Sequence, residues 1–429
     1  MRLMTNPARA SLPAARAASP ATRLATQLAS AMLGAALLSA CSLAPTYKRP
    51  DAPVAAAFPA DDAGKAAKTG ATPSAATNQR DAIDTGWREY FNEPRLQQLI
   101  AAALENNRDL RTAALRIEEA RALYNVQSAD RLPNLNASVG ATRAKTPATV
   151  SPTGESVIGR RVDAGLSISS FELDFFGRVK SLNDAALAAY LATDEARQAA
   201  QISLVAQVAQ AYFTERAYAE QYALAQQTYE ARARTYKLTQ QRAEVGASSR
   251  LDLRSNETLM ETARAAALTL ARQRAQAENA LTLLVGQPSA TGATGAMPTD
   301  SQIDALSAVP AGLPSDLLAR RPDIRAAEQR LKSANANIGA ARAAFFPRIS
   351  LTAAIGSTSP TLGGLFDSGT GSWSFAPQLV LPIFDAGRNR ANLTITEVRK
   401  NLAVADYEKT IQTAFREVAD ALAARDYLG

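Results

Sequence analysis

Residues 178–245 read RVKSLNDAALAAYLATDEARQAAQISLVAQVAQAYFTERAYAEQYALAQQTYEARARTYKLTQQRAEV, and this stretch decides the fold. It contains 68 consecutive residues without a glycine or a proline and is rich in Ala, Gln, Leu, Glu and Arg. Residues 247–285, which follow Gly246, are free of glycine and proline as well. At a rise of about 1.5 Å per residue, the two stretches predict helices of about 100 Å and about 60 Å. Helices of this length are typical of coiled-coil packing.

The two long helices are expected to pair through a seam of tyrosines. Tyr222, Tyr229 and Tyr236 repeat at intervals of seven residues, as core positions of a supercoiled helix pair do. Gly246 separates the helices, and Ser248 and Ser249 are available to cap the second one. We therefore predict a helical hairpin with its tip at Gly246, and an ordinary helical bundle is the alternative.

Four shorter segments alternate between apolar and other residues, which predicts β-strands with one apolar face. The apolar sets are Leu135, Ala137, Val139 and Ala141; Val162, Ala164, Leu166 and Ile168; Ile349, Leu351, Ala353 and Ile355; and Trp373, Phe375, Leu379 and Leu381. Such segments are typical of transmembrane strands, although the strands of a soluble sheet can show the same alternation. Residues 144–161 and 358–372 would be the connecting loops. Four strands cannot close a barrel, so membrane-spanning strands would require further copies of the chain.

The order helix, strand, loop, strand, long helix occurs twice in the chain. Residues 107–111 match residues 321–325 at an offset of 214. The first copy continues 78 residues beyond Val208, whereas the second continues only 11 residues beyond Val418. We therefore expect the second copy to be C-terminally truncated by about 67 residues relative to the first.

These patterns predict a mainly α fold with a transmembrane β part, built from a duplicated helix-strand-strand-helix repeat. The predicted organisation is a signal peptide over 1–40, a lipidated tether over 41–86, a first repeat with the long helical hairpin over 87–288, a linker over 289–309 and an incomplete second repeat over 310–429.

The N-terminus resembles a bacterial lipoprotein leader. Residues 1–40 carry four arginines and no acidic residue, followed by an apolar run that is too short to span a bilayer. Leu38-Ser39-Ala40-Cys41 resembles a lipobox, which predicts that Cys41 becomes the mature N-terminus and carries an N-acyl diacylglyceryl lipid. Ser42 at the next position favours delivery to the outer membrane over retention in the inner membrane.

Composition excludes several classes of function. Loss of the four leader arginines lowers the formal charge from +7 to +3, because 43 basic residues then face 40 acidic ones. The sequence pI of about 9.5 is therefore no evidence for a nucleic-acid partner. The chain has one cysteine and no histidine, so the commonest general base and metal ligand is missing. We expect no catalytic residue, no metal site and no cofactor besides the lipid on Cys41.

Three stretches carry a family resemblance: residues 41–50, residues 312–324 (GLPSDLLARRPDI) and residues 382–388 (PIFDAGR). They resemble the TolC/OprM-type outer membrane efflux family in its lipoprotein branch. The resemblance implies a homotrimer in which each protomer gives four strands to one twelve-stranded barrel, with an α-helical barrel crossing the periplasm. It also implies a passive outer-membrane channel that docks onto a periplasmic adaptor protein and an inner-membrane pump of the RND type. Drugs, solvents, dyes or metal ions would leave the cell through it.

Candidate site residues follow from the same patterns. Gly177 and Gly387 are expected to form turns from strand into helix. The hairpin tip is expected either to contact the adaptor or to be an ordinary capped turn. Its residues are Glu244, Val245, Gly246, Ser249, Arg250 and Asp252. Arg320 and Arg321 are expected either to pair with acidic side chains or to be solvated, and solvation is favoured.

Three other functions are alternatives to small-molecule efflux. A duct of the same family would export proteins in type I secretion. A periplasmic coiled-coil scaffold would have no pore, and a cysteine at Ser359 would then stay unlabelled from outside the cell. A lipid-anchored hydrolase would need a nucleophile, a base or a phosphate-binding loop, and no such motif is present in the sequence.

Overall fold

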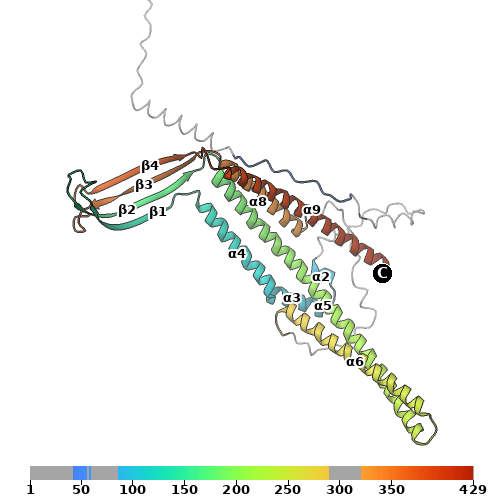
Figure 1. The fold of residues 1–429 in the computed structure, drawn as a ribbon. Helices are drawn as coiled ribbons and strands as arrows, with labels where there is room; N and C mark the ends of the chain where they lie inside the picture. Colours follow the sequence, from blue (N-terminus) through green and yellow to red (C-terminus); the bar gives the residue numbers. More distant parts are fainter. Residues whose placement is uncertain (1–41, 56–57, 59–85, 289–319, 429) are drawn as a thin grey trace, which may run out of the picture. The chain divides into compact units, whose positions relative to one another are not determined.

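The computed structural model describes residues 42–55, 58, 86–288 and 320–428. The predicted signal peptide, the lipid attachment at Cys41 and the linker over 289–309 lie outside the described residues. In chain order, the elements are α2 (Trp87–Tyr90), α3 (Pro94–Asn106), α4 (Arg108–Ala129), β1 (Leu135–Thr146), β2 (Val157–Leu173), α5 (Arg178–Glu244), α6 (Arg250–Val285), α8 (Pro322–Ala343), β3 (Arg348–Ser359), β4 (Gly371–Val380) and α9 (Arg388–Leu428) (Figure 1). Within these residues, no helix is both long enough and apolar enough to cross a membrane.

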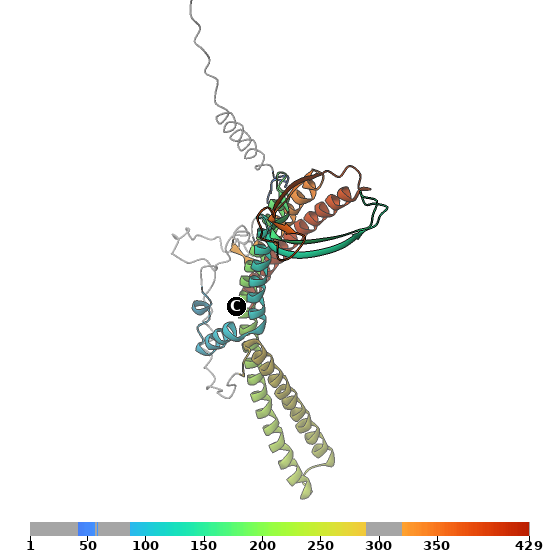
Figure 2. The same ribbon diagram turned by 90° about the vertical axis from the view of Figure 1, so that its left-hand side faces the viewer.

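The two long helices form the predicted hairpin. Figures 1 and 2 show α5 and α6 side by side, joined by the turn that contains Gly246. Arg274 Nε of α6 lies 3.2 Å from Glu215 Oε1 of α5, which ties the two helices together across the seam. Tyr222 and Tyr229 are half buried while most of their neighbours on α5 are exposed, so the heptad seam is confirmed.

The four alternating segments form one antiparallel sheet in the order β1-β2-β3-β4. The register pairs apolar residues with one another: Ala137 with Leu166, Leu166 with Ile355, and Ile355 with Trp373. Because side chains alternate between the faces of a sheet, these pairs belong to one continuous apolar face. The four predicted strands and their alternation are therefore confirmed, except at Leu381, which follows the end of β4 at Val380.

The connections between strands are shorter than predicted. The sequence predicts loops over 144–161 and 358–372, but β1 and β2 remain paired as far as Thr146 and Val157. On the other hairpin, β3 continues to Ser359. The hydrogen-bonded ladder thus extends beyond the apolar alternation, where the sequence pattern no longer marks a strand.

A bulge changes the faces of β2 near its end. Between Ile168 and Phe171, two residues of β2 stand opposite the single Thr352 of β3. Ser170 adopts a positive φ of 51° there, and its N–H donates to Thr352 Oγ1 at 3.2 Å. The extra residue returns Phe171 to the apolar face and turns Glu172 onto the opposite face.

The two halves of the chain repeat each other, as predicted. Helices α4 and α8 each contain 22 residues, and they begin 214 positions apart, at Arg108 and Pro322. Strands β1 and β3 each contain 12 residues. Pro322 is the first residue of α8, a position where proline is favoured because the N–H it lacks has no partner in the helix.

Two compact units interleave along the chain. Among the described residues, the sheet unit comprises 42–45, 129–182 and 336–395, and the helical unit comprises 46–55, 58, 86–128, 183–288, 320–335 and 396–428. The helical unit has two hydrophobic clusters. One joins α3, α5 and α6 around the fully buried Ile100 and Val208, and the other joins α8 and α9 around the fully buried Ile324 and Tyr407.

Candidate functional site

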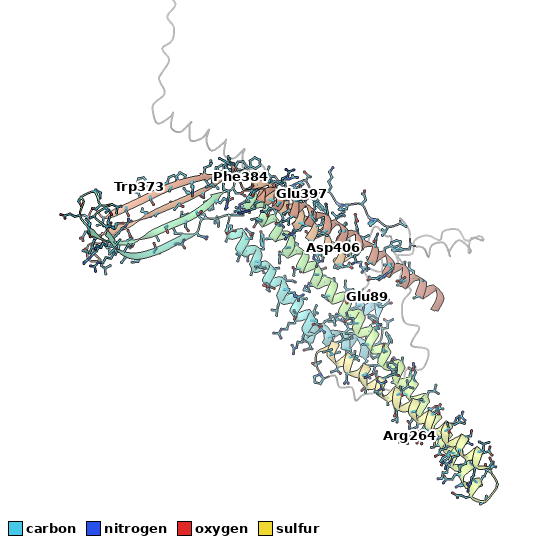
Figure 3. The ribbon with its side chains drawn as sticks, in the orientation of Figure 1. Glu89, Arg264, Trp373, Phe384, Glu397 and Asp406 are labelled. Carbon is cyan, nitrogen blue, oxygen red and sulfur yellow. The ribbon has the colours of Figure 1, made fainter. Side chains whose placement is uncertain are left out.

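The apolar face of the sheet is exposed in the single chain. Leu166, Ile355 and Trp373, which are neighbours on three successive strands, are 45%, 67% and 79% exposed. Figure 3 labels Trp373 on β4 and Phe384 in the connection to α9, which also contains the predicted strand residue Leu381. An exposed apolar surface that spans a whole sheet marks contact with lipid or with another protein.

The opposite face of the sheet carries small and polar side chains. One row of the register crosses all four strands as Ser138, Gly165, Gly356 and Ser372. The middle of this face therefore presents neither bulky nor charged groups. A sheet with one apolar face and one small, polar face fits a barrel wall between lipid and an aqueous lumen.

Charged side chains lie near both ends of the polar face, and they are paired. Towards the loops, Arg161 Nε donates to Asp163 Oδ1 at 2.7 Å. At the helix end, Glu172 accepts from Arg178 at 2.7 Å and from Arg348 at 2.6 Å. The bulge in β2 brings Glu172 to this position, so the network depends on a backbone irregularity that the alternation pattern does not reveal.

The turns from strand into helix use glycine at the predicted positions. Gly177 and Gly387 have φ values of 69° and 84°, and each immediately precedes a long helix. The Asp385 carboxylate accepts the backbone N–H groups of Gly387 at 2.9 Å and Asn389 at 2.8 Å. These hydrogen bonds, that of Asn389 first, hold the pKa of Asp385 below its usual value. Asp174 accepts a backbone N–H at 2.7 Å in the first turn of α5, in the same manner.

The hairpin tip is a short turn between Glu244 and Arg250. Gly246 adopts a φ of 75°, in the left-handed region that glycine occupies without steric cost. Val245 and Leu251 flank this turn and are 79% and 78% exposed. The tip therefore presents two apolar side chains to its surroundings.

A capping box closes the tip on the α6 side. Ser249 Oγ accepts the N–H of Asp252 at 3.0 Å, and Asp252 Oδ2 accepts the N–H of Ser249 at 3.4 Å. Each side chain satisfies a backbone donor that the first turn of the helix leaves without a partner. The two predicted tip residues thus have a structural role as a cap.

Replacing Ser249 by alanine is expected to loosen the first turn of α6 while leaving the global melting temperature unchanged. Loss of an N-cap costs about 1 kcal/mol locally. Hydrogen exchange measured by mass spectrometry should show at least a few-fold faster exchange at Asp252 and Leu253. Ser255→Ala, six residues further along the exposed surface of α6, is the control and should leave exchange unchanged. Equal exchange in both variants would contradict a capping role for Ser249.

The second half of the chain holds an N-terminal strap, residues 46–55, against α8 and α9. Tyr47, Ala52 and Val54 pack on the α8–α9 cluster. The Arg49 guanidinium donates to both carboxylate oxygens of Glu328, at 3.1 Å and 2.8 Å. The Tyr47 hydroxyl donates to Glu328 at 3.1 Å. One carboxylate on α8 therefore clamps the strap in place.

The Glu328 side chain is only 6% exposed, and this alone would raise its pKa. Arg49 and Lys332 outweigh that effect of burial and hold the pKa of Glu328 below its usual value. The Tyr407 hydroxyl is also buried and has no hydrogen-bond partner among the described residues. Its pKa is raised, first by burial and then by the Glu328 carboxylate.

The sequence did not predict the clamp, and of its two alternatives for Arg321 the structure shows pairing with acidic side chains. Arg321 is not solvated: it donates to Asp323 at 2.9 Å and also contacts Glu417 of α9. Arg49 and Glu328 are separated by 279 residues, so no local pattern links them. Within the described part of the chain, no group of three or more His, Cys, Asp or Glu side chains is arranged to hold a metal ion.

Comparison with known proteins assigns the family. The model of the family described as "Outer membrane efflux protein" matches residues 99–287 and 313–428. The chain belongs to the outer membrane efflux protein family. It is 50% identical to the outer membrane protein OprJ of Pseudomonas aeruginosa over 400 residues, which cover 93% of this chain and 81% of OprJ. It is 48% identical to the solvent efflux pump outer membrane protein SrpC of Pseudomonas putida over 403 residues, or 93% of this chain and 83% of SrpC.

A solved outer membrane channel has the same fold. The open state of the MtrE outer membrane channel of Neisseria gonorrhoeae superposes with a TM-score of 0.75 at 42% identity, covering 90% of this chain and 83% of MtrE. The predicted family, the fold class, the outer-membrane location and the role as an efflux exit duct are therefore confirmed.

Proposed function

We propose that the efflux protein acts as a homotrimer whose twelve strands close one barrel in the outer membrane and whose helices form an α-helical barrel in the periplasm. The observation that carries this is the open, four-stranded sheet with one apolar face. Within the described residues, the outer edges of β1 and β4 have no partner strand. In lipid, each unpaired backbone group would cost several kcal/mol. Pairing β4 of one copy with β1 of the next removes both edges and keeps the antiparallel order.

The trimer would be the passive exit duct of a tripartite efflux system and would carry out no chemistry itself. A periplasmic adaptor and an inner-membrane pump of the RND type would supply substrate and energy. Similarity to a solvent efflux component favours small molecules over secreted proteins as cargo. The small, neutral middle of the polar face supports broad substrate acceptance, because no charged side chain projects there. A lipid on Cys41 would anchor the strap to the same membrane.

Surface labelling tests the barrel. A cysteine at Leu362, which is 72% exposed in the 360–370 loop, should react with a membrane-impermeant maleimide on intact cells. Ser359 is unsuitable because it is only 5% exposed. A cysteine at Gln241, near the hairpin tip, should react only after the outer membrane is permeabilised. A scaffold without a pore predicts that both positions need permeabilisation, and that the purified protein gives no conductance in planar bilayers.

We also propose that the hairpin tip docks the adaptor through Val245 and Leu251. Val245→Glu combined with Leu251→Glu places two charges on the apolar tip and is expected to lower drug resistance at least tenfold in a strain complemented with this duct. Channel conductance in planar bilayers should not change, because the tip lies on a helical hairpin and not on the sheet. Gln240→Glu combined with Gln241→Glu adds the same charge without removing apolar surface and is the control. If both double variants confer equal resistance, the apolar tip does not dock the adaptor.

A further inference from the structure

Three basic residues lie together on the apolar face of the sheet, near its loop end. Arg143 of β1 stands directly opposite Arg160 of β2 in the register, and Lys145 is the next residue of β1 on the same face. All three side chains are exposed. Like charges placed directly opposite each other on two strands are destabilising. Among the described residues, none of the three forms an ion pair with a carboxylate, so the repulsion is not compensated within the chain.

Arg161, the next residue of β2, shows that an arginine without a counter-charge is not a general feature of this strand. Arg161 points to the opposite face and pairs with Asp163 at 2.7 Å. The positive charge on the polar face is therefore neutralised, while the charge of Arg143 and Arg160 on the apolar face is left without a counter-charge. Arg143 and Arg160 would therefore be stabilised by an anion from outside the chain.

The depth of Arg143 and Arg160 in the membrane follows from the length of the apolar face of β2. Along β2, the apolar face runs from Leu173 through Phe171 and Ile168 to Val162, and Arg160 is the next residue on that face. Six apolar positions that are two register rows apart span about 34 Å at a rise of about 3.4 Å per row. With a strand tilt of about 40°, this corresponds to about 26 Å along the membrane normal, close to the roughly 25 Å apolar band of a membrane barrel. Arg160 thus lies at the first level above the hydrocarbon.

The loop-side end of the apolar face lies at different register rows on different strands, as expected for strands that are tilted in a membrane. On β3 the apolar alternation ends at Ile355, because Ser357 and Ser359 follow on the same face. On β1 and β2 it continues two positions further in the register, to Ala141 and Val162. Because a register row of tilted strands crosses the membrane obliquely, the β1–β2 hairpin and the β3–β4 hairpin should leave the hydrocarbon at different rows.

We propose that Arg143 and Arg160, with Lys145, bind the phosphate groups of the outer-leaflet lipid of the outer membrane. Guanidinium groups bind phosphate through paired, charge-assisted hydrogen bonds, and two of them on adjacent strands can hold one phosphate between them. Bound phosphate removes the like-charge repulsion across the β1–β2 hairpin and fixes the barrel at one depth. The placement of these residues in lipid rests on the proposed barrel.

The test uses the full-length protein in nanodiscs of phosphatidylcholine that contain a small fraction of lipid A, with native mass spectrometry to count bound lipid A. Arg143→Gln combined with Arg160→Gln is expected to lower the apparent affinity for lipid A at least tenfold. The loss of hydrogen bonds between charged groups weakens binding by about this factor or more. Arg161→Gln, one residue away on the other face, is the matched control and should bind lipid A like the parent chain. Lipid A without phosphates should bind the parent chain as weakly as it binds the double variant.

Three results would overturn the proposal. Undiminished binding of lipid A by the double variant would exclude Arg143 and Arg160 as ligands. Equal binding of dephosphorylated lipid A would show that acyl chains, and not phosphates, are recognised. Displacement of lipid A by millimolar inorganic phosphate would assign the site to free phosphate. Conductance in planar bilayers is measured on the same samples: absence of conductance in the parent chain contradicts the duct, whereas conductance with unaltered lipid binding contradicts only the lipid site.

Discussion

Replacing Gly165 by alanine is expected to separate β2 from β3 and to prevent assembly of the proposed trimer. Gly165 pairs with Gly356 across the two strands. A Cβ atom on Gly165 would lie 2.5 Å from the carbonyl oxygen of Ile355 and 2.9 Å from the Cα of Gly356. These are backbone atoms, so no side-chain rotation relieves the contact and the strands must move apart. Overpacking of this kind costs about 3 kcal/mol per chain, and a trimer contains three such sites.

The measurement is the fraction of trimer in purified outer membranes, together with its apparent Tm in detergent. Gly140→Ala is the matched control, because a Cβ at Gly140 of β1 would meet no atom within 4 Å. Gly356→Ala should reproduce the defect of Gly165→Ala, since its Cβ would meet the backbone of Ala164. A Gly165→Ala protein that assembles as well as Gly140→Ala would show that the close approach of β2 and β3 is not required.

Replacing Glu328 by alanine is expected to release the N-terminal strap. The change removes the acceptor for Arg49, Tyr47 and Lys332 at a site that is only 6% exposed. Breaking a fully buried pair costs about 3–5 kcal/mol, and we expect about 2 kcal/mol here because the Arg49 side chain is 51% exposed and partly screened. Trypsin should then cut after Lys48 at least tenfold faster, whereas the bond after Arg49 precedes Pro50 and is not a trypsin site. Glu397→Ala, at an exposed position on α9 (Figure 3), should leave cleavage unchanged.

The clamp should also respond to acid. Because the folded pKa of Glu328 lies below its usual value, the carboxylate stabilises the bound strap fully above the unfolded value of about 4.3. That contribution is lost as the pH falls from about 4.3 through the lower folded pKa. Hydrogen exchange over the strap should therefore accelerate in this window in the parent chain but stay flat in Glu328→Ala. An equally steep acceleration in the variant would assign the pH response to another group.

Local sequence patterns were sufficient to predict the long helices, the strands and the family. The absence of glycine and proline over residues 178–245 predicts one helix, and α5 ends within a residue of that limit. Alternation along Leu135 to Ala141 predicts which side chains share a face, because a strand has a period of two. The repeat offset of 214 predicts that α4 and α8 correspond. Each of these properties depends on residues that are close in sequence or on the comparison of two copies.

Only the tertiary structure decided the contacts that join distant parts of the chain. The clamp joins residues 279 positions apart, and the pairing of Gly165 with Gly356 depends on the register between two repeats. The bulge at Ser170 exchanges the faces of β2 and brings Glu172 onto the polar face, which strict alternation would not predict. The sequence by itself determined that this chain is a helical efflux duct with four one-sided strands. The tertiary structure decided which backbone atoms meet, where the strap is held and which charges lack a partner, because these depend on register and packing between segments that no local period connects.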